Sequence, residues 1–204
     1  MNRRKWTSAE LIQFETEIAE TFNAGGIRAP VHLSDGSEES LLDVFGDVHE
    51  GDWVFCSWRS HYQALLHGVP QEEVRQEILN GRSIALCFPK YRLFSSAIVG
   101  GNVPIAVGVA LGIKRGNGDE HVWCFVGDMT SEIGITQSAI KYSLFNALPI
   151  TFVVENNGVS VCTDTLATWG LDELTHSKEE WANVSYFEYR SNYPHAGAGK
   201  RVEF

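Results

Sequence analysis

The sequence predicts an α/β fold built on a mostly parallel sheet that is buried on both faces. Two continuous apolar runs, at 121–126 and 149–154, are typical of buried strands. The segment between them, 131–147, carries apolar side chains near the 3.6-residue spacing of a helix. Strand, helix and strand in this order, with both strands apolar throughout, indicate a βαβ unit of a parallel sheet.

The N-terminal part is expected to be helical. Thr7 and Glu10 form a capping-box pattern ahead of apolar residues at helical spacing, and this helix is expected to end near Gly25 and Gly26. A loop from 30 then leads into a helix through about Phe45. The remaining predicted elements are a strand at 53–56, a helix at 70–79, an irregular segment at 81–101, a helix from 102 to about 114, and a strand at 184–190.

Length and charge limit the class of protein. The 204 residues are 44% hydrophobic and 21% charged, which favours one globular domain over 1–204 with an N-terminal helical arm at about 1–30. The net charge of −10 argues against general nucleic-acid or membrane binding, which needs a basic face. The uncharged stretch 93–113 is too rich in polar residues and glycine for a membrane span. The basic segment 1–5 lacks a following apolar region, so no signal peptide is expected, and the expected location is the cytoplasm.

The four cysteines indicate neither a metal site nor a disulfide framework. Cys56, Cys87, Cys124 and Cys162 are too far apart for a Cys-x-x-Cys pair. The first three lie in apolar runs, so we expect them to be buried free thiols.

The helix from 102 to 114 has an unusual stripe of small residues. Ala106 and Ala110, and likewise Gly108 and Gly112, are four residues apart and share a face. Because glycine costs about 1 kcal/mol in a helix, this stripe needs a packing reason. We expect the helix to pack closely inside the protein or against another subunit.

Polar residues end both strands of the βαβ unit. Asp128 follows the first apolar run, and Asn157 lies 29 residues later, after the second. Ligands of open parallel sheets bind at the carboxyl ends of strands. A carboxylate, an amide oxygen and a nearby carbonyl suit Mg²⁺, and the N–H groups of a following helix favour an anion. The pattern therefore indicates a Mg²⁺–phosphate site, unless Asp128 is only a helix cap and Asn156-Asn157-Gly158 only a turn.

Two nucleotide-binding motifs are absent or weak. No Gly-x-Gly-x-x-Gly follows a strand. Gly197-Ala-Gly199-Lys200 faintly resembles a phosphate-binding loop, but its first glycine is missing and Arg201 replaces Ser or Thr.

Five segments, in order, resemble one known family. They are 31–38, 58–61, 98–104, Gly127-Asp128 with Asn156-Asn157, and Tyr189-Arg190 with Pro194-His195. The fourth resembles the thiamine-diphosphate (ThDP) motif. The set is most similar to the alpha subunit of the first, decarboxylating component of 2-oxo acid dehydrogenase complexes, from about residue 8 onward. The resemblance implies a three-layer α/β sandwich with a mostly parallel sheet, namely the ThDP diphosphate-binding domain.

The resemblance also implies a cofactor site. Asp128, the side chain of Asn157 and the carbonyl of Val159 would hold Mg²⁺ on the diphosphate of ThDP. Arg59 would pair with a diphosphate oxygen, unless it is a surface cation. The backbone around Ile98 and Val99 would contact the aminopyrimidine ring, unless these are plain core residues. The other implied cofactor contacts are Trp58, Gly127, Met129 and Thr130.

Three histidines are candidate catalytic residues on the same resemblance. His32 and His195 would line the substrate end, where they would stabilise charge and move protons. His61 would help to position the diphosphate loop. A structural role is the alternative for each.

The function that the resemblance implies is that of an alpha-type subunit of a ThDP- and Mg²⁺-dependent enzyme. Such an enzyme cleaves the C–C bond next to the carbonyl of a 2-oxo acid or a ketose-like donor. The pyrimidine-binding half and its activating Glu would come from a beta-type subunit, in an α2β2 heterotetramer that meets a lipoyl domain. The alternatives are a split transketolase-like two-carbon transferase, a non-catalytic ThDP-binding partner, and an unrelated Mg²⁺–nucleotide module.

The sequence departs from the family pattern at four places. Met129 replaces a glycine, Trp58 replaces a tyrosine, Ser83-Ile84-Ala85 lacks a histidine, and the stretch from Val161 to Tyr189 is short. The last two departures alter the expected substrate entrance and leave the expected cofactor binding intact.

Overall fold

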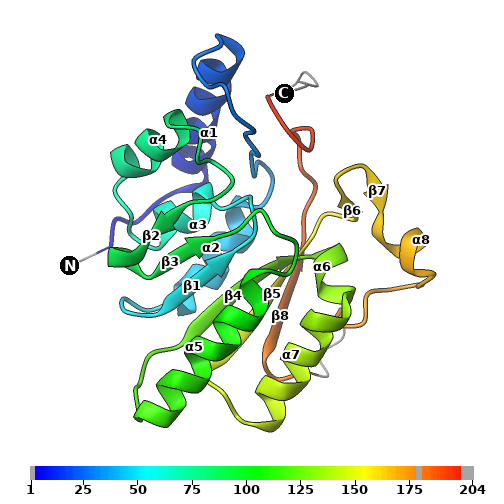
Figure 1. Cartoon of the computed structure of the whole chain (residues 1–204). Helices are drawn as coiled ribbons and strands as arrows, with labels where there is room; N and C mark the ends of the chain where they lie inside the picture. The colour runs from blue at the N-terminus through cyan, green and yellow to red at the C-terminus, as the bar shows by residue number, and fades with distance from the viewer. Residues whose placement is uncertain (1–2, 178–180, 199–204) are drawn as a thin grey trace.

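A six-stranded sheet forms the centre of the computed structural model, which describes residues 3–177 and 181–198. The strand order is β2-β3-β1-β4-β5-β8, and every neighbouring pair except β2–β3 is parallel. Helices cover both faces of the sheet (Figure 1), which confirms the expected three-layer α/β sandwich. The sheet strands are β1 (Trp53–Cys56), β2 (Cys87–Phe88), β3 (Leu93–Ser95), β4 (Val122–Gly127), β5 (Ile150–Asn156) and β8 (Val184–Glu188).

The helices lie in two groups, one on each face (Figure 1). The first group is α1 (Ser8–Asn23), α2 (Glu38–Asp47), α3 (His61–Leu66) and α4 (Gln71–Leu79). The second group is α5 (Asn102–Gly116) and α7 (Gly134–Phe145). The short elements are a 3₁₀ turn at Pro89–Tyr91, α6 (Asp128–Glu132), the hairpin of β6 (Val159–Ser160) and β7 (Thr163–Asp164), and α8 (Thr165–Trp169).

Alternation along the strands divides the core into two clusters. On β4, Trp123 and Phe125 pack with the first group of helices, whereas Cys124 and Val126 pack with the second. Because successive side chains of a strand point to opposite faces, a strand that is apolar at every position must be covered on both sides. This is why the two continuous apolar runs predicted the sheet correctly.

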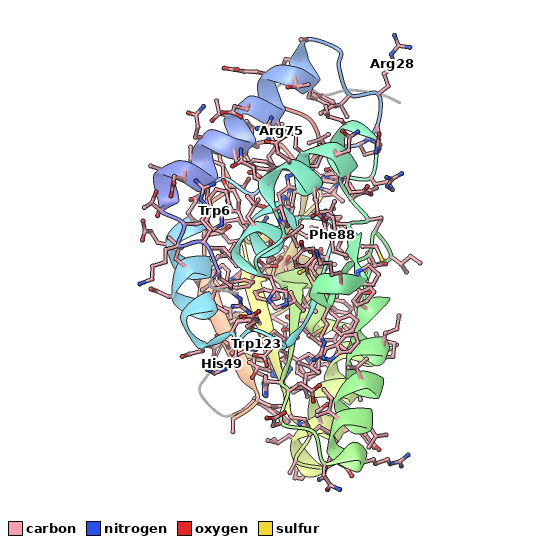
Figure 2. All side chains as sticks on the ribbon, turned by 90° about the vertical axis from the view of Figure 1, so that its left-hand side faces the viewer. Trp6, Arg28, His49, Arg75, Phe88 and Trp123 are labelled. Carbon is pink, nitrogen blue, oxygen red and sulfur yellow. The ribbon has the colours of Figure 1, made fainter. Side chains whose placement is uncertain are left out.

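The segment expected as an N-terminal arm is part of the first core. The capping box is present, with Thr7 Oγ1 accepting from the Glu10 N–H at 3.3 Å and Glu10 Oε2 accepting from the Thr7 N–H at 2.9 Å. The apolar stripe of α1 is buried. On the outside, Arg75 of α4 forms an ion pair with Glu17 of α1, at the place where Figure 2 labels Arg75.

Most predicted elements are confirmed to within two residues. The predicted strands 53–56 and 121–126 are β1 and β4, and the predicted helices 70–79 and 102–114 are α4 and α5. The predicted strand at 149–154 extends two residues further as β5, and the strand predicted at 184–190 ends at Glu188 as β8.

Two element predictions are wrong in part. The segment 81–101 is not wholly irregular, because it contributes β2 and β3 to the edge of the sheet. The single helix expected at 131–147 is divided into α6 and α7 by Ile133, whose backbone is extended. In addition, α3, α8 and the β6–β7 hairpin were not predicted, since each is too short to show a hydrophobic period.

The other expectations have mixed outcomes. Cys56 and Cys124 are buried thiols, but Cys87 is exposed because it points outward from the short edge strand β2. No helix among the described residues is long and apolar enough to cross a membrane. The loop-like motif around Gly199 and the basic segment 1–5 lie, in part or whole, outside the described residues.

Candidate functional site at the carboxyl edge of the sheet

A polar pocket lies at the carboxyl ends of β1, β4 and β5, where the βαβ unit predicted a site. The pairing of Gly127 with Glu155 brings the ends of β4 and β5 together. Eight of the predicted site residues line this pocket, and they are Trp58, Arg59, Gly127, Asp128, Met129, Thr130, Asn157 and Val159. The cavity volume is about 40 Å³ and the pocket is open to solvent, so a large ligand would extend beyond it through the mouth.

Asp128 is the buried carboxylate of the pocket. Its side chain is only 2% exposed, and its Oδ2 accepts a hydrogen bond from the Thr165 hydroxyl at 2.5 Å. Burial raises the pKa of Asp128, and the Thr165 hydrogen bond, the Met129 N–H and the Arg59 charge oppose this rise. An anion held in a buried place gains most when a cation binds beside it.

Asn157 faces the same pocket from the end of β5. Its Oδ1 accepts from the Val159 N–H at 3.1 Å, and its Nδ2 donates to the Tyr189 hydroxyl at 3.4 Å. The first contact closes an Asx turn, so the turn that the sequence offered as an alternative does exist. It also fixes the amide oxygen within the pocket that Asp128 lines.

Arg59 supplies the positive charge of the site. Its Nε donates to the Leu33 carbonyl at 3.1 Å, and one terminal nitrogen donates to the His195 carbonyl at 3.3 Å. These two carbonyls hold the guanidinium in the pocket wall. Its charge opposes the rise in the pKa of Asp128, and it adds to the effect of burial, which lowers the pKa of His195. In the described part of the chain, Arg59 forms no ion pair, so it is free to meet an anionic ligand.

Glu155 belongs to the pocket although the sequence analysis did not select it. It is 8% exposed, and Gln63 Nε2 donates to its Oε1 at 2.9 Å. Burial raises the pKa of Glu155 to about 8, against the charge of Arg59 and the Gln63 hydrogen bond. A lone carboxylate at the end of a buried apolar strand was the signal that could have identified it.

His32 and His195 lie together beside the pocket. Their ring centroids are 4.5 Å apart, and the ring of Trp58 lies 6.0 Å from His32 and 6.2 Å from His195. His32 Nδ1 donates to the carbonyl of His195, which leaves Nε2 as the acceptor. Burial lowers the pKa of His32 to about 4, so both its protonation state and its tautomer suit an acceptor at neutral pH.

His61 does not reach the pocket. It is fully buried, with Nδ1 at 3.0 Å from Glu15 Oε1 and Nε2 at 2.8 Å from Ser83 Oγ. Both ring nitrogens are therefore engaged in the core. These contacts favour the structural alternative for His61 and show no direct contact between its side chain and the pocket, so any role in positioning the diphosphate loop stays a prediction.

Ile98 and Val99 line a second, adjoining pocket. This pocket shares Trp58 and Thr130 with the first. The two side chains are 74% and 53% exposed, so they are not the plain core residues that the sequence offered as an alternative.

α8 lies over one side of the mouth. The indole N–H of Trp169 donates to Met129 Sδ at 3.0 Å, and Thr165 at the start of the helix holds Asp128. The short stretch after Val161 thus still contacts two residues that line the pocket, Asp128 and Met129.

The donor set fits a hard cation that keeps outside ligands. Among the described residues, no group of three or more His, Cys, Asp or Glu side chains is placed to hold a metal. A site of Asp128, the Asn157 amide and one carbonyl leaves positions for phosphate and water, which is how Mg²⁺ is usually bound. Zn²⁺ sites, by contrast, use three or four protein ligands.

Fold and pocket together define an α/β protein with a polar pocket at the carboxyl edge of a parallel sheet, which is the edge where such sheets usually bind ligands. The model of the family described as "Dehydrogenase E1 component" matches residues 7–177, and the chain therefore belongs to this family.

Characterised relatives support the alpha-subunit resemblance. The chain is 29% identical over 165 residues to the alpha subunit of acetoin:2,6-dichlorophenolindophenol oxidoreductase from Bacillus subtilis, covering 76% of this chain and 49% of the relative. It is 26% identical over 188 residues to the pyruvate dehydrogenase E1 component subunit alpha of Rickettsia felis, covering 87% and 57%. The chain thus spans about half the length of these relatives.

One solved structure overlaps part of the chain. It is described as a putative thiamin diphosphate-dependent enzyme from Mycobacterium smegmatis, with 24% identity, a TM-score of 0.41, and coverage of 57% of this chain and 20% of that one. The identification of the family rests on the family model.

Proposed function

We propose that this chain provides the diphosphate-binding half of a ThDP- and Mg²⁺-dependent enzyme, as an alpha-type subunit. The observation that carries this proposal is the meeting of Asp128, Asn157 and Arg59 in one pocket at the ends of adjacent strands. Asp128, the Asn157 side chain and the Val159 carbonyl would hold Mg²⁺, and Arg59 would pair with a diphosphate oxygen. When bound, ThDP would supply a carbon nucleophile for a carbonyl group and an electron-accepting ring for the cleavage of the neighbouring C–C bond.

The chain's own residues would orient the ligand and handle charge around it. The fixed amide of Asn157 and the Thr165-held carboxylate of Asp128 need little rearrangement to bind a cation. His32 Nε2 and the His195 ring lie on the side of the pocket next to Trp58, where they would accept and return protons. The backbone at Ile98 and Val99 would contact the pyrimidine end of the cofactor.

We infer that a beta-type subunit supplies the rest of the active site. This inference rests on the relatives, which are named as alpha subunits and therefore as one part of a larger enzyme. The outer faces of α5 and α7 expose Ile105, Ile135 and Phe145 at 55%, 48% and 83%, which suits a subunit contact. We propose an α2β2 assembly in the cytoplasm that acts on a 2-oxo acid and passes its product to a lipoyl domain.

A transketolase-like transferase is the second candidate. Among its described residues, the segment from Val161 to Tyr189 holds β7, the short helix α8 and β8 as its regular elements. A shorter segment here leaves a more open entrance, which suits a sugar donor. Parallel assays of lipoyl-domain reduction and of ketol transfer, with the paired subunits, distinguish the two enzymes.

Calorimetry with ThDP and Mg²⁺ tests the site itself. In the complex of this chain with its beta-type partner, Asp128→Asn and Asn157→Ala should each weaken ThDP binding by about tenfold or more, since each removes a metal ligand. Asp43→Asn, which neutralises an exposed carboxylate on α2, is the matched control. Unchanged affinity in both site variants would refute the metal assignment, and binding without turnover in either assay would indicate the non-catalytic partner.

A further inference from the structure

Another cavity, separate from the two adjoining pockets described above, lies at the opposite edge of the sheet, where the parallel strands begin. It is formed by the loop before β1, the turn between α3 and α4, the segment before β3 and the first described residues of the chain. Its volume is about 380 Å³, against about 40 Å³ for the pocket at the carboxyl edge. The proposed cofactor site makes no use of it.

The side chains around this cavity are mainly basic. Arg3, Arg4, Lys90 and Arg92 line it together with His67, and Glu50 is its single acidic lining residue. The whole chain has 26 acidic residues against 16 Lys and Arg. A local excess of cations in so acidic a protein is the opposite of what a random surface would show.

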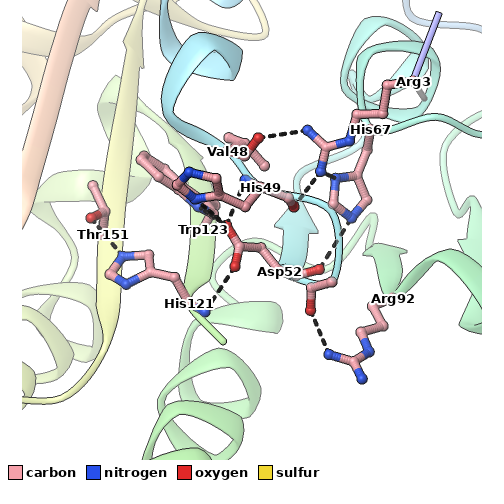
Figure 3. Close-up of polar contacts among 10 residues, drawn as sticks. Arg3, Val48, His49, Asp52, His67, Arg92, His121, Trp123 and Thr151 are labelled. Atoms are coloured by element: carbon pink, nitrogen blue, oxygen red, sulfur yellow. Dashed lines mark hydrogen bonds and ion pairs between the residues drawn. The ribbon is translucent and has the colours of Figure 1, made fainter. Parts of the chain in front are cut away.

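A buried network holds the floor of the cavity in place (Figure 3). Both carboxylate oxygens of Asp52 accept hydrogen bonds, from the backbone N–H groups of His49 and His121 at 2.8 and 2.9 Å, and from the Trp123 indole at 3.1 Å. Asp52 is 4% exposed. The loop that carries Glu50 and the start of β1 are thereby fixed.

Arg3 is bound to this floor without an ion pair. It donates to the carbonyls of Val48, at 2.6 Å, and of His49, and to His67 Nδ1 at 3.2 Å (Figure 3). His67 therefore carries its proton on Nε2, which donates to the Asp52 carbonyl at 3.2 Å. In the described residues no carboxylate lies within ion-pair distance of Arg3, and its Nε is buried without a partner.

Lys90 stands at the rim. Its ammonium lies 5.0 Å from the centre of the Tyr91 ring and 3.3 Å from that residue's hydroxyl. No carboxylate within the described chain pairs with it. Arg92 and Arg4 form ion pairs with Glu120 at 3.0 Å and Glu10 at 2.7 Å. The charge of Arg3 is balanced only in part, by the nearby charges of Asp52 and Glu50, and Lys90 has no ion pair among the described residues.

We propose that this cavity binds a phosphate group, either free or carried by a small molecule. The Arg3 guanidinium, which the carbonyls of Val48 and His49 hold in place, would contribute a fixed positive charge, and the Lys90 ammonium would add a mobile point charge. The cavity has room for a phosphate and several further atoms, which favours a phosphate ester over a simple ion. The site is independent of the proposed cofactor site, because it lies at the other end of the strands.

Amide NMR of the full ¹⁵N-labelled chain tests this proposal. Inorganic phosphate and glycerol phosphate are titrated at constant ionic strength, with chloride as the reference. We expect saturable shifts at the amides of Gly51, Gly68 and Tyr91. Tighter binding of the ester identifies a phosphorylated small molecule, and tighter binding of the inorganic ion identifies free phosphate.

Charge variants give the decisive comparison. Lys90→Met should weaken binding at least fivefold, and Lys90→Arg should restore most of it; both are changes at an exposed position that leave the core intact. Lys141→Met removes the same charge from exposed α7 and should change affinity less than twofold. Arg59→Gln should leave these shifts unchanged. Non-saturating shifts with both probes, or equal affinity in the two Met variants, would overturn the proposal.

Discussion

At the residue scale, Asp52 shows how one buried carboxylate organises an edge of the sheet. Its two oxygens accept three N–H groups, one from the loop before β1 and two from the start of β4. An asparagine at position 52 would keep one acceptor oxygen, but its NH₂ group would face N–H donors that have lost their acceptor. We expect Asp52→Asn to lower the free energy of unfolding by about 2–4 kcal/mol, because buried donors lose their acceptor.

Urea unfolding followed by tryptophan fluorescence measures this effect. The control is Asp43→Asn, which removes an exposed carboxylate and should change stability by less than about 0.5 kcal/mol. Equal stability of the two variants would show that the network around Asp52 contributes nothing.

His67 makes stability depend on pH. Burial, with Arg3 beside the ring, lowers the pKa of His67 to about 4, whereas an unfolded histidine titrates near about 6.5. The unfolded chain therefore binds a proton first, and this contribution to stability is present above about pH 6.5 and is lost as the pH falls toward 4. His67→Gln keeps an acceptor and a donor and should remove at most about 3 kcal/mol of this pH dependence.

Parallel unfolding curves between pH 4 and 7 measure the difference between His67→Gln and the wild type. Because His32 titrates equally in both proteins, the difference isolates His67. A wild-type curve with the same slope as the variant would mean that His67 is protonated in the folded state.

Site residues could be predicted from the sequence where they directly follow a strand, because the ends of adjacent parallel strands lie together. Asp128 and Asn157 end adjacent apolar strands, so their meeting follows from the βαβ pattern. Thr165 was not predictable, because its contact with Asp128 depends on where α8 lies. The buried contacts of His61 were not predictable, because its partners Glu15 and Ser83 come from distant segments whose packing the sequence does not reveal.

At the element scale, glycine positions distinguish close approach from open space. Gly36 has φ +108°, and a Cβ there would lie 2.2 Å from the Arg190 carbonyl, in the segment after β8. Gly46, within α2, has open space around it. Gly36→Ala should therefore destabilise the fold by more than about 2 kcal/mol, whereas Gly46→Ala should stabilise it by up to about 1 kcal/mol.

Thermal unfolding of the two variants tests this opposite pair. A drop in the melting temperature for Gly36→Ala and a rise for Gly46→Ala is the expected result. If both variants shift in the same direction, the contact between the loop before α2 and the segment after β8 is not as described.

The sequence predicted the long helices and strands and missed the short ones. β4 and β5 have six and seven residues, enough for a continuous apolar run, and α1 has a capping box. β2 and β3 have two and three residues, and they are strands because the sheet beside them supplies partners. The break between α6 and α7 was not predictable either, because the extended backbone at Ile133 leaves no mark in the hydrophobic periodicity.

At the scale of the whole molecule, the sheet separates two polar sites. The carboxyl edge holds Asp128, Asn157 and Arg59, and the amino edge holds the basic cavity at Lys90. Both depend on a few local cations, so a net charge of −10 is compatible with anionic ligands. The helical layer of α5 and α7 covers the second core and leaves its outer side exposed (Figure 1).

The outer side of α5 is the best test of assembly. Ala106 and Ala110 are buried against the sheet, as expected for a packed helix, but Gly108 and Gly112 face open space. Nothing within the described chain requires these two glycines, although each costs about 1 kcal/mol in a helix. In the assembly that we propose, close approach of another subunit would explain them, and methyl groups there would prevent it.

The double variant Gly108→Ala, Gly112→Ala should therefore have opposite effects on the chain and on its complex. The isolated chain should gain about 1–2 kcal/mol in its free energy of unfolding, since two glycines leave an exposed helix. Association with the beta-type subunit or with a second alpha chain should weaken by at least tenfold in analytical ultracentrifugation. Lys114→Ala, at the exposed end of the same helix, controls for changes outside the stripe.

A more stable chain that still assembles with wild-type affinity would place the subunit contact on another face, and the exposed apolar side chains of α7 would be the next to test.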